Sequence, residues 1–236
     1  MAEFENVSWT NQQNARYYEI TPIEVQQCFA ERGGLSSYSD LLLIQSYISQ
    51  TRSVLEVGAC YGRVIDYLLQ SGFKGDITAI ERSEKYFNYL KTKYQNTSVT
   101  LAHVDAAQFH SDKKFDLILW LWSGISDFTL DEQFNILERL SCCLLPTGFL
   151  VINTFSPIAH PLNAEFSNNR SYIIRSDEWP LYGYIPSARE IKKYAASANF
   201  EIKEIPYITS TNRPRVLYVL FNQNKKMSRL KNNKLN

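Results

Sequence analysis

The fold of this 236-residue chain is decided by the stretch Glu56-Val57-Gly58-Ala59-Cys60-Tyr61-Gly62-Arg63. The stretch follows an apolar run at 53–55 and precedes an amphipathic segment at 64–69. This order predicts a strand, a tight glycine turn and a helix. In an open α/β sheet, such a turn places bare backbone and a helix N-terminus at the carboxyl end of a strand, where small ligands bind.

The spacing of the glycines indicates which ligand the turn fits. A dinucleotide fingerprint, G-x-G-x-x-G, lets the backbone approach a pyrophosphate closely. Counted from Gly58, that pattern needs glycines where this chain has Cys60 and Arg63. The chain reads E-x-G-x-C-x-G instead, and a ligand without phosphates tolerates one side chain in the turn. A nicotinamide-dependent dehydrogenase is therefore a remote alternative.

The turn resembles motif I of the class I S-adenosylmethionine-dependent methyltransferases, [DE]-x-G-x-G-x-G, with Cys60 at the middle glycine. A plain glycine turn between strand and helix is the structural alternative. The resemblance implies an α/β fold: a doubly wound, mostly parallel seven-stranded sheet with an antiparallel last strand, plus an N-terminal helical cap. It also implies S-adenosyl-L-methionine as cofactor, bound by Tyr18, Glu56, Gly58, Ala59, Cys60, Gly62, Arg63, Glu81, Arg82, Asp105, Ala106 and Trp122.

Acidic residues follow the next two predicted strands. The β-type run at 76–80 ends in Glu81, roughly 20 residues beyond the turn, where a carboxylate accepts both ribose hydroxyls of an adenosine. A third run at 99–103 precedes Asp105, and the resemblance implies that Asp105 binds the adenine amino group. A solvated loop carboxylate at Glu81 and a turn-capping aspartate at Asp105 are the alternatives. His103 is interpreted as a strand residue with a hydrogen-bonded ring.

The remaining strands complete the predicted sheet. The continuous apolar run at 115–122 is typical of a central parallel strand covered on both faces. A helix is predicted over 130–144 and a strand over 149–154, with an L-x-P-x-G motif between them. This motif also resembles the family. A helix at 187–197 precedes two strands, at 200–205 and 216–221, without a crossover helix. They predict an antiparallel hairpin at the sheet edge.

Three segments lie outside this core. Residues 1–50 are predicted to form a helical cap, with helices at 22–32 and 39–50, and the methyltransferase domain spans 51–223. Tyr17 and Tyr18 of the cap either face the sulfonium of the cofactor or pack the cap on the domain. The insertion at about 155–186 is too long for a plain connection and is interpreted as a substrate lid, with a packing hairpin as alternative. The basic tail at 224–236 is predicted to be solvated.

Composition excludes several classes of function. The net charge of +1 gives no whole-molecule attraction to nucleic acid. No apolar run approaches the ~20 residues of a membrane span, and the polar N-terminus lacks a signal-peptide core. The four cysteines show neither metal-site nor disulfide spacing. We therefore expect reduced thiols, no metal and a cytoplasmic location, and the sequence leaves a homodimer open.

The implied chemistry is a direct displacement at the methyl carbon of a sulfonium, in which the protein supplies proximity and alignment. A general base is needed only for an acceptor that keeps its proton, and the candidates are His160, then His110 and Asp127. After the fourth strand the chain reads Leu121-Trp122-Ser123-Gly124, not Asn-Pro-Pro-Tyr or Asp-Pro-Pro-Tyr. This difference favours a small-molecule acceptor. A methyltransferase acting on RNA or protein and a non-catalytic cofactor- or partner-binding module are the alternatives.

We make two predictions for Cys60, one for its backbone angle and one for its thiol. With Gly58 and Gly62 free to take unusual backbone angles, we expect a negative φ at Cys60. A thiol close to a helix N-terminus has a lowered pKa, so thiol reagents are expected to inhibit cofactor binding.

Overall fold

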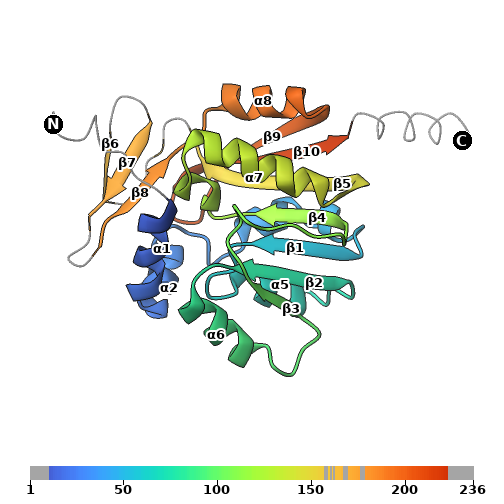
Figure 1. The fold of residues 1–236 in the computed structure, drawn as a ribbon, viewed down its shortest axis with the longest axis horizontal. Coiled ribbons are helices and arrows are strands. Elements are labelled where there is room, and N and C mark those ends of the chain that lie inside the picture. Colours follow the sequence, from blue (N-terminus) through green and yellow to red (C-terminus); the bar gives the residue numbers. More distant parts are fainter. Residues whose placement is uncertain are drawn as a thin grey trace, which may run out of the picture.

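The computed structural model describes residues 11–156, 159, 161, 163–166, 170–175 and 179–222. The candidate base His160 and the predicted tail at 224–236 lie outside these residues. Figure 1 shows one large sheet with helices on both of its faces and a smaller sheet beside the first helices of the chain.

The large sheet has seven strands in the order β3-β2-β1-β4-β5-β10-β9. Neighbouring strands from β3 to β5 run parallel, whereas β10 is antiparallel to both β5 and β9. The expected doubly wound sheet with a reversed last strand is therefore confirmed. The strands are β1 (Ser53–Val57), β2 (Asp76–Glu81), β3 (Thr100–His103), β4 (Phe115–Trp120), β5 (Leu144–Phe155), β9 (Phe200–Ile208) and β10 (Pro214–Asn222).

Two apolar clusters cover the two faces of this sheet. One joins the sheet to α7 (Leu130–Cys142) and α8 (Ala188–Ser197) through residues such as Leu137 and Ile191. The other joins it to α5 (Arg63–Gln70), α6 (Glu84–Lys93) and the short helices before β1, through residues such as Ile65 and Leu90. Both α7 and α8 begin with a capping box, which satisfies N–H groups of their first turns.

The N-terminal segment differs in detail from the prediction. It contains α2 (Ile23–Arg32), as predicted, and also α1 (Asn11–Ile20), which the sequence pattern does not predict. The predicted helix at 39–50 is two short helices, α3 (Ser39–Leu43) and α4 (Gln45–Ile48). They separate at the buried Ile44, whose φ of −107° and ψ of 11° are not helical. α1 is held by contacts distant in sequence, because Asn14 Nδ2 donates to the carbonyls of Asp127 and Tyr182.

The insertion after β5 forms a three-stranded antiparallel sheet of β6 (Ala164–Phe166), β7 (Ser171–Ile174) and β8 (Leu181–Tyr184). β8 lies against α1 and against the short 3-10 helix η1 (Gly124–Asp127) that follows β4. The insertion and the first helix thus meet at the end of the sheet where the parallel strands terminate (Figure 1). Within the described part of the chain, no helix is long and apolar enough to cross a membrane.

Candidate functional site

The glycine turn between β1 and α5 contains three residues with positive φ: Gly58 at 74°, Cys60 at 52° and Gly62 at 87°. The expectation of a negative φ at Cys60 is wrong. The backbone N–H groups of Gly58 and Ala59 both donate to the Ile80 carbonyl at the end of β2, at 3.0 and 3.1 Å. These bonds hold the turn against the neighbouring strand, and Cys60 takes a left-handed conformation that a glycine adopts without strain.

Glu81 braces the same turn from the tip of β2. One carboxylate oxygen accepts from the Cys60 N–H at 2.7 Å and the other from the Ser83 N–H at 2.8 Å. Ser83 in turn caps α6 by accepting from the Tyr86 N–H. Burial raises the pKa of Glu81, while these two backbone bonds act in the opposite direction. A carboxylate has about four acceptor sites, so two remain for a ligand.

The pKa of the Cys60 thiol also differs from the prediction. Burial, followed by the charge of Glu81, raises its pKa well above the ordinary value of a thiol. Desolvation disfavours the thiolate more than the nearby helix N-terminus favours it. The predicted pKa lowering is therefore wrong, and the thiol is protonated at neutral pH.

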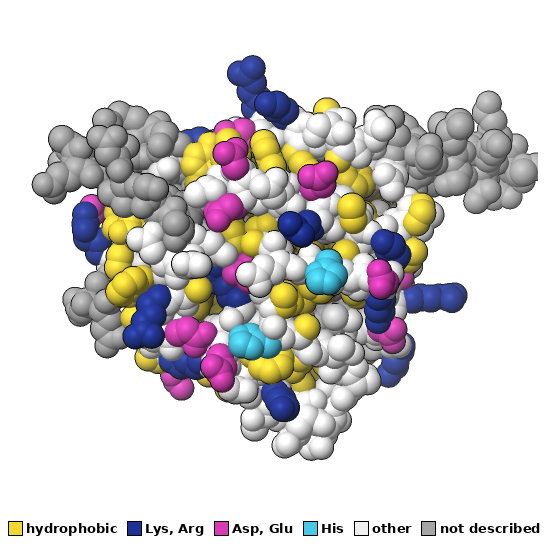
Figure 2. Space-filling model, in the orientation of Figure 1, with side chains coloured by type: hydrophobic (Ala, Val, Ile, Leu, Met, Phe, Trp, Pro, Cys, Tyr) yellow, Lys and Arg dark blue, Asp and Glu magenta, His cyan; other side chains and the backbone are white. Residues whose placement is uncertain are grey.

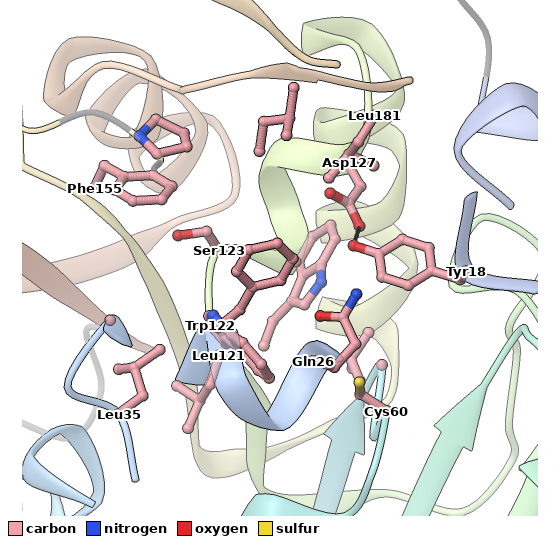
Figure 3. Close-up of a pocket in the computed structure, with 18 of the residues that line it drawn as sticks. Tyr18, Gln26, Leu35, Cys60, Leu121, Trp122, Ser123, Asp127, Phe155 and Leu181 are labelled. Atoms are coloured by element: carbon pink, nitrogen blue, oxygen red, sulfur yellow. Dashed lines mark hydrogen bonds between the residues drawn. The ribbon is translucent and has the colours of Figure 1, made fainter. Parts of the chain in front are cut away.

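A charged and polar network extends from α1 to the end of η1. Tyr18 Oη donates to Asp127 Oδ2 at 2.6 Å, as Figure 3 shows, and Arg82 Nη2 lies 3.8 Å from the same oxygen. Arg82 also pairs with Asp105 Oδ2 at 3.5 Å and donates to the side chain of Asn11. Burial raises the pKa of Asp127 to about 6, with Arg82 and Tyr18 opposing the shift. Asp127 is thus a carboxylate that can accept a proton near neutral pH.

Glu56 and Arg63 lie deeper, beneath the turn. Burial raises the pKa of Glu56 to about 8, and its Oε2 has no hydrogen-bond partner among the residues that the structure describes. Arg63 forms a bidentate pair with Asp40, at 2.9 and 2.6 Å, and donates to the Leu35 carbonyl. The Arg63 guanidinium therefore ties α5 to the N-terminal segment.

A cavity of about 500 Å³ opens over the carboxyl ends of the parallel strands. This volume is within the range of small-molecule sites. Figure 3 shows Tyr18, Gln26 and Cys60 on one side of it, Phe155 and Ser123 on the other, and Trp122 between them. The segments that meet around it are α1 and α2, the glycine turn, the ends of β2 to β5, the small sheet and the β9–β10 turn.

The cavity brings together most of the residues predicted to bind a cofactor. Glu56, Ala59 and Arg63 line a smaller pocket that shares Gly58, Cys60 and Trp122 with the cavity. Gly62 and Asp105 line neither space. The predicted residues that line the cavity are Tyr18, Gly58, Cys60, Glu81, Arg82, Ala106 and Trp122.

The candidate bases differ in whether they line the cavity. Asp127 lines the cavity, whereas His110 does not; His110 is exposed and its Nδ1 lies 3.3 Å from the Gln108 carbonyl. His103 is also exposed, with its Nε2 at 3.0 Å from the Arg82 carbonyl and its ring stacked on Phe87. His160, the first candidate, lies outside the described residues.

Sequence reasoning missed the part of the cavity wall made by Arg215, Ser123 and Gln26, whereas Phe155 belongs to the insertion that was interpreted as a substrate lid. Arg215 immediately precedes an apolar strand, and no motif marks it. Within the described residues, no cluster of three or more His, Cys, Asp or Glu side chains is arranged to hold a metal ion.

Comparison with known proteins agrees with this geometry. Residues 54–148 match the family model described as a methyltransferase domain. Among curated proteins, none matches the sequence. The match covers the glycine turn, the ends of β2 to β4 and the residues up to the middle of β5.

Solved structures share the fold at low sequence identity. The CcbJ methyltransferase from Streptomyces caelestis is 16% identical, with 81% of this chain and 95% of that chain covered and a TM-score of 0.63. DesVI from Streptomyces venezuelae is 17% identical, with 87% of this chain and 100% of that chain covered and a TM-score of 0.63. Magnesium protoporphyrin IX methyltransferase from Synechocystis PCC 6803 is 15% identical, with 92% of this chain and 99% of that chain covered and a TM-score of 0.66. It was solved with bound S-adenosylmethionine.

The chain has the Rossmann-like α/β fold that the solved methyltransferases share, with a cavity at the carboxyl ends of its parallel strands. The family match is more specific for part of the chain: residues 54–148 match a methyltransferase domain.

Proposed function

We propose that this protein transfers the methyl group of S-adenosylmethionine to a small organic acceptor bound in the same cavity. One observation carries this proposal: a single space joins the glycine turn and the end of β2 to an apolar compartment lined by Trp122, Phe155 and Leu181. The small sheet and α1 contribute to its wall. A donor and a small acceptor therefore have room to meet at one point.

The residues present suit the donor. A Cβ placed on Gly58 would meet no atom within 4 Å, so this glycine leaves open space beside the turn. Glu81 keeps two acceptor sites for ribose hydroxyls at the end of β2, and Val104 and Ala106 offer apolar surface at the end of β3. Tyr17 and Tyr18 cover this half of the cavity from α1, where an aromatic ring stabilises a sulfonium by cation–π attraction. When bound, the donor supplies an electrophilic methyl carbon on a sulfonium.

The side chains of the chain then orient the acceptor and exclude water. Asp127 lines the cavity and has a pKa of about 6, so at neutral pH its carboxylate takes a proton from an acceptor oxygen or nitrogen. Tyr18 and Arg82 hold this carboxylate in place. Asp127 is our proposed base among the described residues.

The surface disfavours a nucleic-acid acceptor. On the face shown in Figure 2, lysine and arginine side chains are scattered among aspartate and glutamate side chains, and the net charge of the chain is +1. A protein that neutralises many phosphates presents a surface of one sign. The cytoplasmic location and a homodimer stay predictions.

Methyl transfer from labelled donor tests the class of acceptor. The protein is incubated with methyl-labelled S-adenosylmethionine and, separately, with small metabolites, total RNA or total protein from a cell extract. We expect label in the small-molecule fraction, and less of it with Glu81→Ala. Label only in RNA or only in protein contradicts the proposal, and so does turnover that the Glu81 substitution leaves unchanged.

A further inference from the structure

Arg215 occupies an unusual place at the edge of the cavity. It is the second residue of β10 and pairs in register with Phe155, the last residue of β5. Its side chain is 3% exposed, yet it lines the cavity together with Ser123 and Phe155. The structure therefore places a guanidinium at the wall opposite the glycine turn and Tyr18.

Among the described residues, the side chains that hydrogen-bond with Arg215 are all neutral: those of Asn153, Ser123 and Tyr207. Nε donates to Asn153 Oδ1 at 3.2 Å and Nη2 donates to Ser123 Oγ at 2.8 Å. The guanidinium also lies over the Phe155 ring, 4.4 Å from its centroid. Among the described residues, no carboxylate lies within 4.0 Å of it. The acidic group that acts on Arg215 from further away is Asp40, whose carboxylate is already in its bidentate pair with Arg63.

A buried cation without a counter-charge is costly. Burial lowers the pKa of Arg215, but a guanidinium stays charged at neutral pH. Buried charges in proteins are normally paired with an opposite charge. The five N–H donors of a guanidinium exceed the three side-chain oxygens that bond with it here, those of Asn153, Ser123 and Tyr207, so the group retains capacity for a ligand.

We propose that Arg215 binds a carboxylate of the methyl acceptor, so that the acceptor is an organic acid with an apolar body. This inference rests on the proposed function. The planar fork of arginine matches a carboxylate with two parallel hydrogen bonds, and one buried cation balances one negative charge. Arg213, exposed at the same rim of the cavity, attracts an anion toward it. The apolar body then lies against Tyr172, Ile174 and Leu181.

The competing occupant is the carboxylate of the cofactor itself. The structure argues against it, because Glu81, Gly58 and Tyr18 define the donor half of the cavity, whereas Arg215 is joined to Ser123 and Phe155 beyond the ends of β4 and β5. Binding of S-adenosylhomocysteine and of an organic acid, measured in the same variants, distinguishes the cofactor carboxylate from the acceptor carboxylate as the partner of Arg215.

The test uses matched acids and amides. Benzoate, phenylacetate and indole-3-acetate, and the primary amide of each, are titrated by calorimetry into the full chain saturated with S-adenosylhomocysteine. We expect at least one acid to bind about tenfold more tightly than its amide, as a charge-assisted pair requires. Arg215→Met should abolish this preference and Arg215→Lys should keep part of it. Arg189→Met, at an exposed arginine of α8, should leave it unchanged.

Each outcome bears on one claim. The inference is overturned if no acid is preferred by the wild-type protein, or if the preference survives in Arg215→Met. It is also overturned if Arg215→Met weakens S-adenosylhomocysteine binding tenfold while leaving the acid preference intact, because Arg215 then serves the cofactor. If the wild-type protein does not bind S-adenosylhomocysteine, the proposed function fails, and the same titrations without it still report on Arg215. Thermal unfolding of both Arg215 variants shows whether they fold.

Discussion

Cys60 holds a backbone conformation that residues with a side chain rarely adopt, at φ 52°. Two contacts keep it there: its N–H donates to Glu81, and the preceding residues of the turn donate to the Ile80 carbonyl. The strain is local and is offset by these bonds. A cysteine at this position therefore preserves the turn at a cost in stability.

Replacing Cys60 tests this strain. Cys60→Gly and Cys60→Ala both remove the thiol, but only the alanine variant keeps a Cβ at positive φ. The left-handed conformation costs roughly 1–2 kcal/mol for a residue with a Cβ, and the extra unfolded-state freedom of glycine costs about 0.4–1 kcal/mol. We expect Cys60→Gly to be more stable than Cys60→Ala by about 0.5–1 kcal/mol in urea unfolding. Equal stability, or a more stable alanine variant, contradicts a strained Cys60.

Glu56 makes the stability of the protein depend on pH. Burial raises its pKa from an ordinary value of 4.5 to about 8, so across this window the folded chain holds the proton more tightly than the unfolded chain. The free energy of unfolding contributed by Glu56 therefore falls as pH rises through the window and is constant above it. The glutamine of Glu56→Gln does not titrate, so the stability of this variant lacks the pH dependence that Glu56 contributes.

We expect the stability of Glu56→Gln, relative to the wild-type protein, to increase between about pH 5 and pH 9. Urea unfolding of both proteins across this range measures the difference, in which the titration of all other groups cancels. A difference that does not change with pH shows that Glu56 is ionised in the folded protein at all these values.

At the scale of elements, the junction of β1 and α5 depends on Gly62. Its φ is 87°, and a Cβ there would lie 2.2 Å from Tyr94 Oη. That hydroxyl donates to the Gly62 carbonyl and bonds with Asp66 Oδ1, which ties α6 to the start of α5. A side chain at position 62 must therefore displace the ring that holds the two helices together.

A pair of glycine substitutions separates this packing effect from backbone strain. Gly72, after the end of α5, has a φ of 74° and open space around its Cβ position. Gly72→Ala should cost only the strain, roughly 1–2 kcal/mol, whereas Gly62→Ala should cost about 1–3 kcal/mol more because of overpacking. Thermal or urea unfolding of the two variants measures the difference. If both cost the same, Tyr94 moves freely and does not fix the turn.

The parallel strands could be predicted from the sequence because their signals are local. Each is a short apolar run ended by a turn, and Glu81 and Asp105 stand at the strand ends where the pattern put them. Helix α1 and strands β6 and β8 could not be predicted in this way. α1 is stabilised by Asn14, whose partners, Asp127 and Tyr182, are more than a hundred residues away. The left-handed conformation of Cys60 was missed for a similar reason, since its carboxylate partner lies on another strand.

At the scale of the whole molecule, the cavity exists only because distant segments converge at one edge of the sheet. The half that we propose for the donor uses residues that the turn and strand ends mark in the sequence. Its other half uses Arg215, Ser123 and Phe155, which only the pairing of β10 with β5 and the end of β4 bring together. The proposed donor therefore rests on motifs in the sequence, whereas the proposed acidic acceptor rests on the structure.

Calorimetric titration of S-adenosylmethionine and S-adenosylhomocysteine is the most direct test of the central claim that the cavity is a methyl-donor site. We predict that the wild-type chain binds both. Glu81→Ala should bind each roughly tenfold to a hundredfold more weakly, because hydrogen bonds to a charged group contribute about 1.5–3 kcal/mol. Asp76→Ala, at the exposed start of the same strand, should bind them as the wild-type protein does. The absence of detectable binding of either compound to the folded wild-type protein at millimolar concentration, or unchanged affinity in a folded Glu81→Ala variant, would contradict the account.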